Sequence, residues 1–96
     1  MNDDELDRVF KAIGDPTRRR IIDRLRERPG QSLFEICALF FAENGMALSR
    51  QAVTQHLDML EKAGLVHVEW SGRTKIHSLD LDPLREAVDL WLRKHL

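Results

Sequence analysis

The sequence predicts a mainly α-helical domain that carries one β-hairpin, in the order α-α-α-α-β-β-α. Three observations lead to this fold class. Apolar residues recur every three to four positions before residue 63 and again over residues 83–95, which is the period of an amphipathic helix. The period changes to two over residues 65–79, as in a pair of strands. Glycine, proline and helix-capping residues stand where the pattern changes.

Length and composition fit one small domain. The chain has 96 residues, of which 43% are hydrophobic and 32% are charged, values that suit a globular fold and exclude intrinsic disorder. The longest apolar run, residues 36–42, is far shorter than the roughly 20 residues that span a bilayer. No basic-then-apolar leader opens the chain. We therefore expect a cytoplasmic protein that does not bind a membrane.

The first two predicted helices cover residues 3–13 and residues 16 to about 27. Acidic residues separate the apolar positions of the first, and Gly14 ends it. Asp15 can cap the second helix, and Pro16 suits its first turn, where no amide donor is needed. Ile21, Ile22 and Leu25 would be its buried side.

Two more helices and a hairpin follow. Ser32 and Glu35 form a capping box before a third, apolar helix. Ser49 is placed to cap a fourth helix over residues 49–62, which buries a stripe of apolar residues and exposes polar ones. Alternating residues 65–70, a turn at 71–72 and a returning strand 74–79 predict the hairpin. A last helix covers residues 83–95, after Asp82.

Consecutive helices, a capped helix with a polar outer face and a hairpin directly after it describe a winged helix-turn-helix. In that fold the capped helix enters the major groove of DNA, where arginine can bond guanine and glutamine can bond adenine. Basic residues near the tip of the hairpin suit phosphate or a minor groove. The predicted DNA-binding residues are Ser49, Arg50, Gln51, Thr54, Gln55, His56, Arg73 and Lys75.

Two parts of this prediction have alternatives. His56 borders the buried stripe of its helix, so a packing or hydrogen-bonding role suits it as well as a phosphate contact. Arg18, Arg19 and Arg20 either face DNA phosphates or pair with the acidic residues of the first helix, which are Asp3, Asp4, Glu5 and Asp7.

The net charge of −1 does not exclude a nucleic-acid partner, because the charges are unevenly distributed. Residues 1–15 carry five acidic and two basic side chains, whereas residues 16–30 carry two acidic and six basic ones. A local basic surface, rather than the total charge, attracts DNA.

Three stretches resemble the ArsR-type winged-helix transcriptional regulators. They are FKAIGDPTRRRII at residues 10–22, LSRQAVTQHL at residues 48–57 and LEKAGLV at residues 60–66. The resemblance implies a homodimeric repressor that binds a double-stranded DNA operator through the helix at 49–62. It also implies that the first and last helices, 3–13 and 83–95, form the dimer interface. The interface residues would be Leu6, Val9, Phe10, Leu84, Val88, Trp91 and Leu92.

Trp91 and its apolar neighbours have a second interpretation, in which they close the core of one subunit. We favour the dimer, because a tryptophan-bearing last helix beside an apolar first helix suits a two-fold interface. The sequence predicts a roughly palindromic operator for the same reason.

The chain departs from the family pattern in ways that bear on metal binding. Its single cysteine, Cys37, excludes an internal disulfide and a multi-cysteine metal site, so we expect it in the core. Asp82 and His95 keep the spacing of a zinc site known in the last helix of the family, but Leu84 replaces one histidine and the sequence ends before the fourth ligand. No metal and no cofactor are expected.

A second departure is a segment around residues 40–46 that makes the distance from Glu35 to Ser49 longer than in the family pattern. We hypothesise that it shifts the recognition helix or makes a contact specific to this dimer. No catalytic motif appears, so the chain is not expected to be an enzyme.

Two other functions remain open at this point. One is a repressor that responds to a metal or a small molecule. The other is a dimeric protein-interaction module without DNA binding, in which Phe40 and Phe41 are exposed to a partner.

Overall fold

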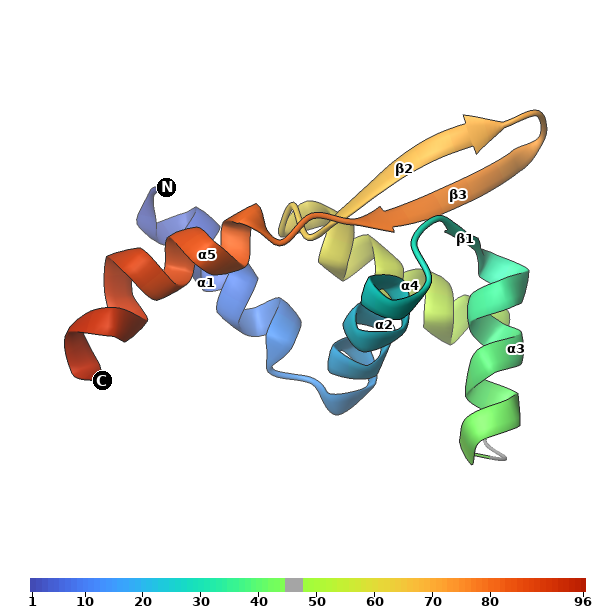
Figure 1. Ribbon diagram of the computed structural model, residues 1–96, viewed down its shortest axis with the longest axis horizontal. Helices are drawn as coiled ribbons and strands as arrows, with labels where there is room; N and C mark the ends of the chain where they lie inside the picture. Colours follow the sequence, from blue (N-terminus) through green and yellow to red (C-terminus); the bar gives the residue numbers. More distant parts are fainter. Residues whose placement is uncertain (45–47) are drawn as a thin grey trace.

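The computed structural model describes residues 1–44 and 48–96 and shows the predicted winged helix-turn-helix (Figure 1). The helices are α1 (Asp3–Ile13), α2 (Pro16–Glu27), α3 (Leu33–Asn44), α4 (Arg50–Lys62) and α5 (Asp82–Ala87). The strands are β1 (Gln31–Ser32), β2 (Val66–Ser71) and β3 (Thr74–Leu79). No helix in the described residues is long and apolar enough to cross a membrane.

Side chains cap the helices where the sequence predicted. Asp15 accepts a hydrogen bond from the backbone N–H of Arg18 at 3.0 Å, and Pro16 occupies the first turn of α2. Ser32 and Glu35 each accept from the other's backbone N–H, at 3.2 and 3.1 Å. Ser49 accepts from the N–H of Ala52 at 3.0 Å and fixes the start of α4. These bonds satisfy amides that a helix leaves free at its first turn.

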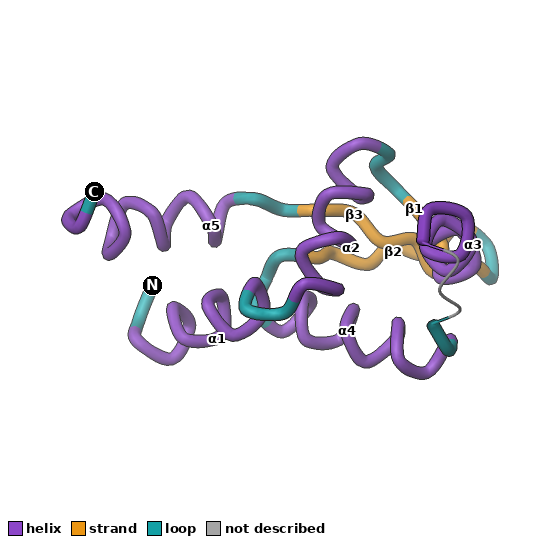
Figure 2. Tube along the Cα trace, turned by 90° about the horizontal axis from the view of Figure 1, so that it is seen from below, coloured by secondary structure: helices purple, strands orange, loops and turns teal. Residues whose placement is uncertain are grey.

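The core lies where α2, α3 and α4 meet the base of the hairpin. Figure 2 shows α1 and α4 along one edge of the molecule, with α2 crossing above them. The apolar side chains with no exposed surface are Val9, Ala12, Ile21, Leu25, Ile36, Val53, Leu60 and Leu65. Cys37 is half-buried against this core, and burial raises the pKa of its thiol.

The sheet has three strands, one more than predicted, in the order β1-β3-β2. β1 pairs antiparallel with β3 and places Gln31 opposite His77. The buried side-chain amide of Gln31 donates to the carbonyls of Arg24 and Arg28, at 3.2 and 2.8 Å, and so closes the end of α2. A strand of two residues has no alternating pattern of its own, and Ser32 already had a role as a cap. The sequence therefore gave no separate sign of β1.

The hairpin of β2 and β3 projects beyond the helices (Figure 1). Alternation predicted Val66, Val68 and Trp70 on one face, and the burial of that face falls along the strand. Val66 is 1% exposed, Val68 is half-buried and Trp70 is 68% exposed. Trp70 lies past the end of the core, so its ring is left on the surface.

The last helix is shorter and less regular than the predicted span of 83–95. Regular α-helix ends at Ala87, and a π-helical turn (Val88–Leu92) and a 3-10 turn (Arg93–His95) follow. In the π turn the N–H of Arg93 donates to the carbonyl of Val88, five residues earlier. The apolar spacing in this segment fits an α turn and a π turn about equally, so periodicity alone could not separate them.

Candidate nucleic-acid interface

The position of α4 is set by its cap and its buried face. Ser49 starts the helix, and Val53, Leu57 and Leu60 hold one side of it in the core. The opposite side therefore faces solvent. The predicted reading residues Arg50, Gln51, Thr54 and Gln55 are all exposed on it.

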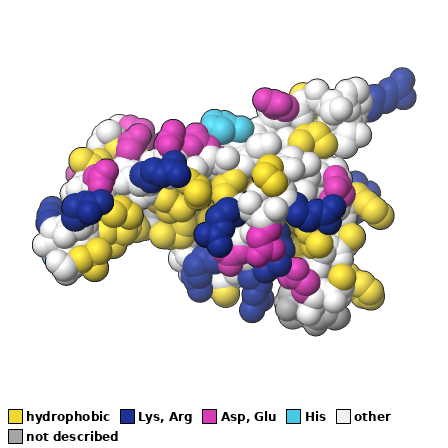
Figure 3. All heavy atoms as spheres, in the orientation of Figure 1, with side chains coloured by type: hydrophobic (Ala, Val, Ile, Leu, Met, Phe, Trp, Pro, Cys, Tyr) yellow, Lys and Arg dark blue, Asp and Glu magenta, His cyan; other side chains and the backbone are white. Residues whose placement is uncertain are grey.

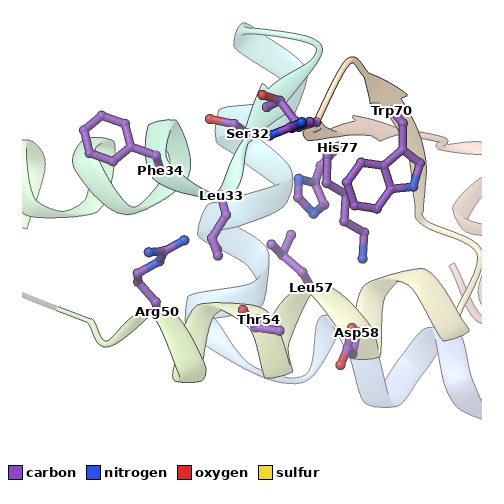
Figure 4. Close-up of a pocket in the computed structure, with 12 residues that line it drawn as sticks. Ser32, Leu33, Phe34, Arg50, Thr54, Leu57, Asp58, Trp70 and His77 are labelled. Atoms are coloured by element: carbon purple, nitrogen blue, oxygen red, sulfur yellow. The ribbon is translucent and has the colours of Figure 1, made fainter.

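A groove of about 470 Å³ runs between α4, the start of α3 and the hairpin (Figure 4). Three cations line it: Arg50 from α4, and Arg73 and Lys75 from the hairpin. None of them forms an ion pair with an acidic residue in the part of the chain that the structure describes. Phe34 and Trp70, which are 77% and 68% exposed, also line the groove. Free cations along one groove make it suitable for a polyanion.

Residues of β3 and of α4 form the inner wall of this groove. Leu33 and Leu57 contribute its apolar part, and the ring of His77 points into it from β3 (Figure 4). His77 is 4% exposed, and its Nδ1 lies 3.0 Å from the carbonyl oxygen of Gln31. Because a carbonyl can only accept, Nδ1 carries the proton. The contact with β1 thus fixes both the orientation and the tautomer of the His77 ring.

The wing presents its basic residues at its far end. Gly72 has a φ of +62° in the turn between β2 and β3, a conformation that favours glycine. Arg73 and Lys75 follow this turn and are exposed, and Lys75 is the cross-strand partner of Trp70. The space-filling view shows a basic side chain projecting from the end of the wing (Figure 3). This placement suits contact with DNA beside the major groove.

His56 differs from the other predicted DNA-binding residues because its ring is turned inward. Its Nδ1 lies 3.3 Å from a terminal nitrogen of Arg18 and 3.9 Å from Oδ2 of Asp15, and the side chain is 23% exposed. These contacts engage the ring within the chain, as in the hydrogen-bonding alternative. The other predicted residues, Ser49, Arg50, Gln51, Thr54, Gln55, Arg73 and Lys75, are exposed.

Arg18 and Arg19 have a role that neither sequence interpretation included. The guanidinium of Arg18 donates to the carbonyls of Ala12 and Lys11, at 2.7 and 2.9 Å, and that of Arg19 donates to Ile13 at 2.7 Å. The two arginines thus satisfy carbonyls at the end of α1, where a positive charge also favours the helix dipole. Within the described residues, neither pairs with an acidic residue of α1.

Three of the predicted dimer-interface residues, Leu6, Phe10 and Trp91, line one hollow beside α1, whereas Leu84 packs against the core of its own chain. Trp91 is 43% exposed and packs edge-on against Phe10, with ring centroids 5.8 Å apart. Leu6, Phe10, Leu84, Val88 and Leu92 are half-buried. Val9 is fully buried within its own chain and offers no surface to a partner.

Leu90 is an exposed apolar side chain that the sequence pattern did not single out. It is 51% exposed and lies in the π turn, off the spacing that joins Leu84, Val88 and Trp91. Its exposure depends on the geometry of that turn, which the sequence did not indicate.

The protein-interaction alternative relied on both phenylalanines of α3, and the structure corrects half of it. Phe40 is 2% exposed and belongs to the core, whereas Phe41 is 63% exposed. The longer segment at 40–46 extends α3 to Asn44, and its remainder lies outside the described residues. No three His, Cys, Asp or Glu side chains gather around a possible metal position within the described part of the chain.

Sequence reasoning also missed two side chains at the groove. Trp70 was assigned to the inner face of the hairpin, and Phe34 received no role. The position of Phe34 in the first turn of α3, opposite the wing, follows from tertiary structure alone.

The capped helix with an exposed polar face, the basic wing beside it and the groove between them define a winged helix-turn-helix domain that binds DNA. The comparisons with known proteins agree with this class. A family profile described as "Helix-turn-helix domain" matches residues 13–69. The HTH-type transcriptional regulator YuzN of Bacillus subtilis is 36% identical over 90% of this chain and 94% of its own length. The transcriptional repressor SdpR of the same organism is 30% identical over 91% of this chain and 88% of its own.

A solved structure extends the likeness to the whole fold. The ArsR-like transcriptional regulator from Rhodococcus sp. RHA1 superposes with a TM-score of 0.74 and 31% sequence identity, over 95% of this chain and 79% of that one. The chain belongs to the ArsR-type winged helix-turn-helix family and is a DNA-binding transcriptional regulator.

Proposed function

We propose that this regulator is a homodimeric repressor acting on DNA in the cytoplasm, with no metal or cofactor of its own. Each subunit lays α4 in the major groove of one half-site and places the wing against the neighbouring backbone. The observation that carries the proposal is the groove where Arg50, Arg73 and Lys75 gather without acidic partners among the described residues. Repression is supported by the name of its relative SdpR.

The surface of the terminal helices supports the dimer. A hollow beside α1 is lined by Leu6, Phe10 and Trp91 together with Asp3 and Asp7. Exposed aromatic and aliphatic side chains with a charged rim are the usual composition of a subunit interface. A two-fold dimer reads a two-fold sequence, so we expect half-sites about 34–36 Å apart, which is one turn of B-DNA.

Selection of bound molecules from a pool of random duplexes tests this function. The full chain is expected to enrich a roughly palindromic motif, and its affinity for that motif is expected to fall steeply with salt as counterions are released. Sedimentation equilibrium of the free protein is expected to give the mass of a dimer. A pool without any enriched motif would rule out sequence-specific reading and leave the interaction module as the better explanation.

A further inference from the structure

Asp58 is an acidic side chain in a position that repels DNA unless it has a specific partner there. Arg50, Thr54 and Asp58 succeed one another at intervals of four residues and form a row along α4 (Figure 4). Asp58 lines the groove toward the wing and also a second groove on the other side of α4, which includes Gln55 and Lys62. Asp58 therefore lies on the outermost line of α4, on the face of the helix that is proposed to enter the major groove.

The carboxylate of Asp58 is not used within the described chain. Its side chain is exposed, and no ion pair or hydrogen bond joins it to another described residue. Of the cations that line its two grooves, Arg18 is already bonded to carbonyls of α1. Asp58 has no helix to cap either, because it lies in the interior of α4.

An unpaired carboxylate on this face of α4 can distinguish bases by the hydrogen-bond donors and acceptors that they present in the major groove. Ionised aspartate only accepts hydrogen bonds, so it is repelled by the acceptors N7 and O6 of guanine and O4 of thymine. The N4 amino group of cytosine is a donor, and cytosine itself carries no acceptor on its major-groove edge. Adenine also offers a donor, but its N7 acceptor lies beside it. Cytosine is the base that satisfies the carboxylate.

We propose that Asp58 is a specificity-determining residue that accepts a hydrogen bond from the N4 amino group of a cytosine in each half-site. The inference rests on the proposed function, since it requires α4 to lie in the major groove. Arg50 and Asp58 are eight positions apart, which corresponds to about 12 Å along a helix. Base pairs succeed one another at about 3.4 Å, so if α4 runs along the groove the cytosine lies about three to four pairs from the base that Arg50 contacts.

The test repeats the duplex selection with the wild type, Asp58→Asn and Glu61→Gln. Glu61 is the matched control, because it is an exposed acidic residue of the same helix that lines neither groove. Wild type and Glu61→Gln are expected to enrich the same motif, with a cytosine at one position of each half-site. Asp58→Asn is expected to keep the rest of the motif and to lose this cytosine, with adenine gaining at that position because asparagine pairs with its N6 and N7 edge.

Binding measurements separate base reading from simple charge repulsion. Changing the cytosine in both half-sites to thymine is expected to weaken wild-type binding about 5- to 150-fold per contact and to leave Asp58→Asn nearly unaffected. Asp58→Asn is also expected to bind an unrelated duplex more tightly than the wild type while binding the selected operator less tightly. If the charge only repelled phosphate, its removal in Asp58→Asn would instead strengthen both complexes.

The outcomes distinguish this inference from the function on which it rests. A wild-type motif that Asp58→Asn reproduces unchanged would overturn the role of Asp58 and leave DNA reading by α4 intact. Tighter binding of Asp58→Asn to operator and unrelated duplex alike would overturn it as well. Failure of the wild type to enrich any motif would overturn the proposed function itself.

Discussion

The carboxylate of Asp15 caps the start of α2 and also lies 3.9 Å from Nδ1 of His56 on α4. Its Oδ2 accepts a hydrogen bond from the N–H of Arg18, and this bond is the main reason that the pKa of the Asp15 carboxyl lies below its ordinary value of 3.8. Burial of the carboxyl opposes this effect, and the positive charge of Arg18 lowers the pKa further. The folded chain thus favours the ionised form more than the unfolded chain does, which makes this cap sensitive to acid.

Replacing Asp15 with asparagine keeps a capping oxygen but removes the titration. The wild-type carboxylate contributes fully above its unfolded pKa near 3.8, and its contribution is lost as the pH falls through the lower folded pKa. Urea unfolding at about pH 7 and about pH 3 is expected to show a smaller loss of stability on acidification for Asp15→Asn than for the wild type. Asp15→Ala removes the cap and is expected to cost about 0.5–2 kcal/mol at neutral pH. Equal acid sensitivity of Asp15→Asn and wild type would contradict this account.

Arg73 and Gln55 test whether the wing positions the protein on the DNA backbone while α4 reads the bases. Arg73 lies beyond the wing turn, and the proposed complex places it against backbone phosphate. Arg73→Ala is therefore expected to weaken all duplexes similarly and to reduce the salt slope by about 1. Gln55 lies on α4, and Gln55→Ala is expected to cost about 1–3 kcal/mol on the selected operator and to relax base preference at one position. Fluorescence anisotropy over a range of salt concentrations measures both effects. A sequence-dependent loss for Arg73→Ala would show that the wing reads bases.

The wing is an element with a strong framework at its base and an exposed end. β1 and the Gln31–His77 contact hold its base, while Trp70 and Lys75 face each other across the strands near its tip. Trp70 therefore lies near the free end of the hairpin, beside the proposed DNA surface. Indole fluorescence responds to such a change of surroundings because the ring is exposed in the free protein.

The two tryptophans of the chain allow this element to be observed separately. Trp91→Phe leaves Trp70 as the only tryptophan, and its emission is expected to change when operator DNA is added. Trp70→Phe leaves Trp91, whose emission is expected to change on dilution, as a dimer dissociates, and to respond little to DNA. The reverse assignment, with Trp91 responding to DNA, would place the DNA surface on the terminal helices.

Elements whose ends are fixed by local chemistry could be predicted from the sequence. The caps Asp15, Ser32 and Ser49 act on amides within three residues, so the pattern of the chain contains the whole interaction. β1 depends on its pairing with the distant strand β3, and this contact leaves no periodic sign in the sequence. The site follows the same division. The exposed face of α4 was visible from its helical period, whereas the inward turn of His56 depends on Arg18, which is 38 residues away.

At the scale of the whole molecule, the two proposed surfaces lie toward opposite ends. The terminal helices α1 and α5 occupy one end of the 39 Å long axis, and the wing and α3 occupy the other (Figure 1). This separation means that a substitution on one surface can be made without touching the other. Substitutions on the DNA surface are therefore expected to leave dimerisation intact.

Trp91→Asp places a charge on the proposed interface, at a side chain that is 43% exposed and lines the hollow beside α1. It is expected to give a monomer by sedimentation equilibrium, with an unchanged circular dichroism spectrum and weaker operator binding, since a single subunit engages only one half-site. Phe41→Asp is the matched control, because it exchanges an exposed apolar side chain for the same charge on α3. A dimer that survives Trp91→Asp but not Phe41→Asp would move the interface to α3.

The guanidinium of Arg18 contacts both α1 and α4. It donates to carbonyls at the end of α1 and lies 3.3 Å from His56 in the middle of α4. In the proposed dimer, α1 meets the partner subunit and α4 meets the operator, so one side chain ties the angle of the reading helix to the way the subunits pair. The range of half-site spacings that the proposed dimer accepts is then expected to depend on the contact between α1 and α4.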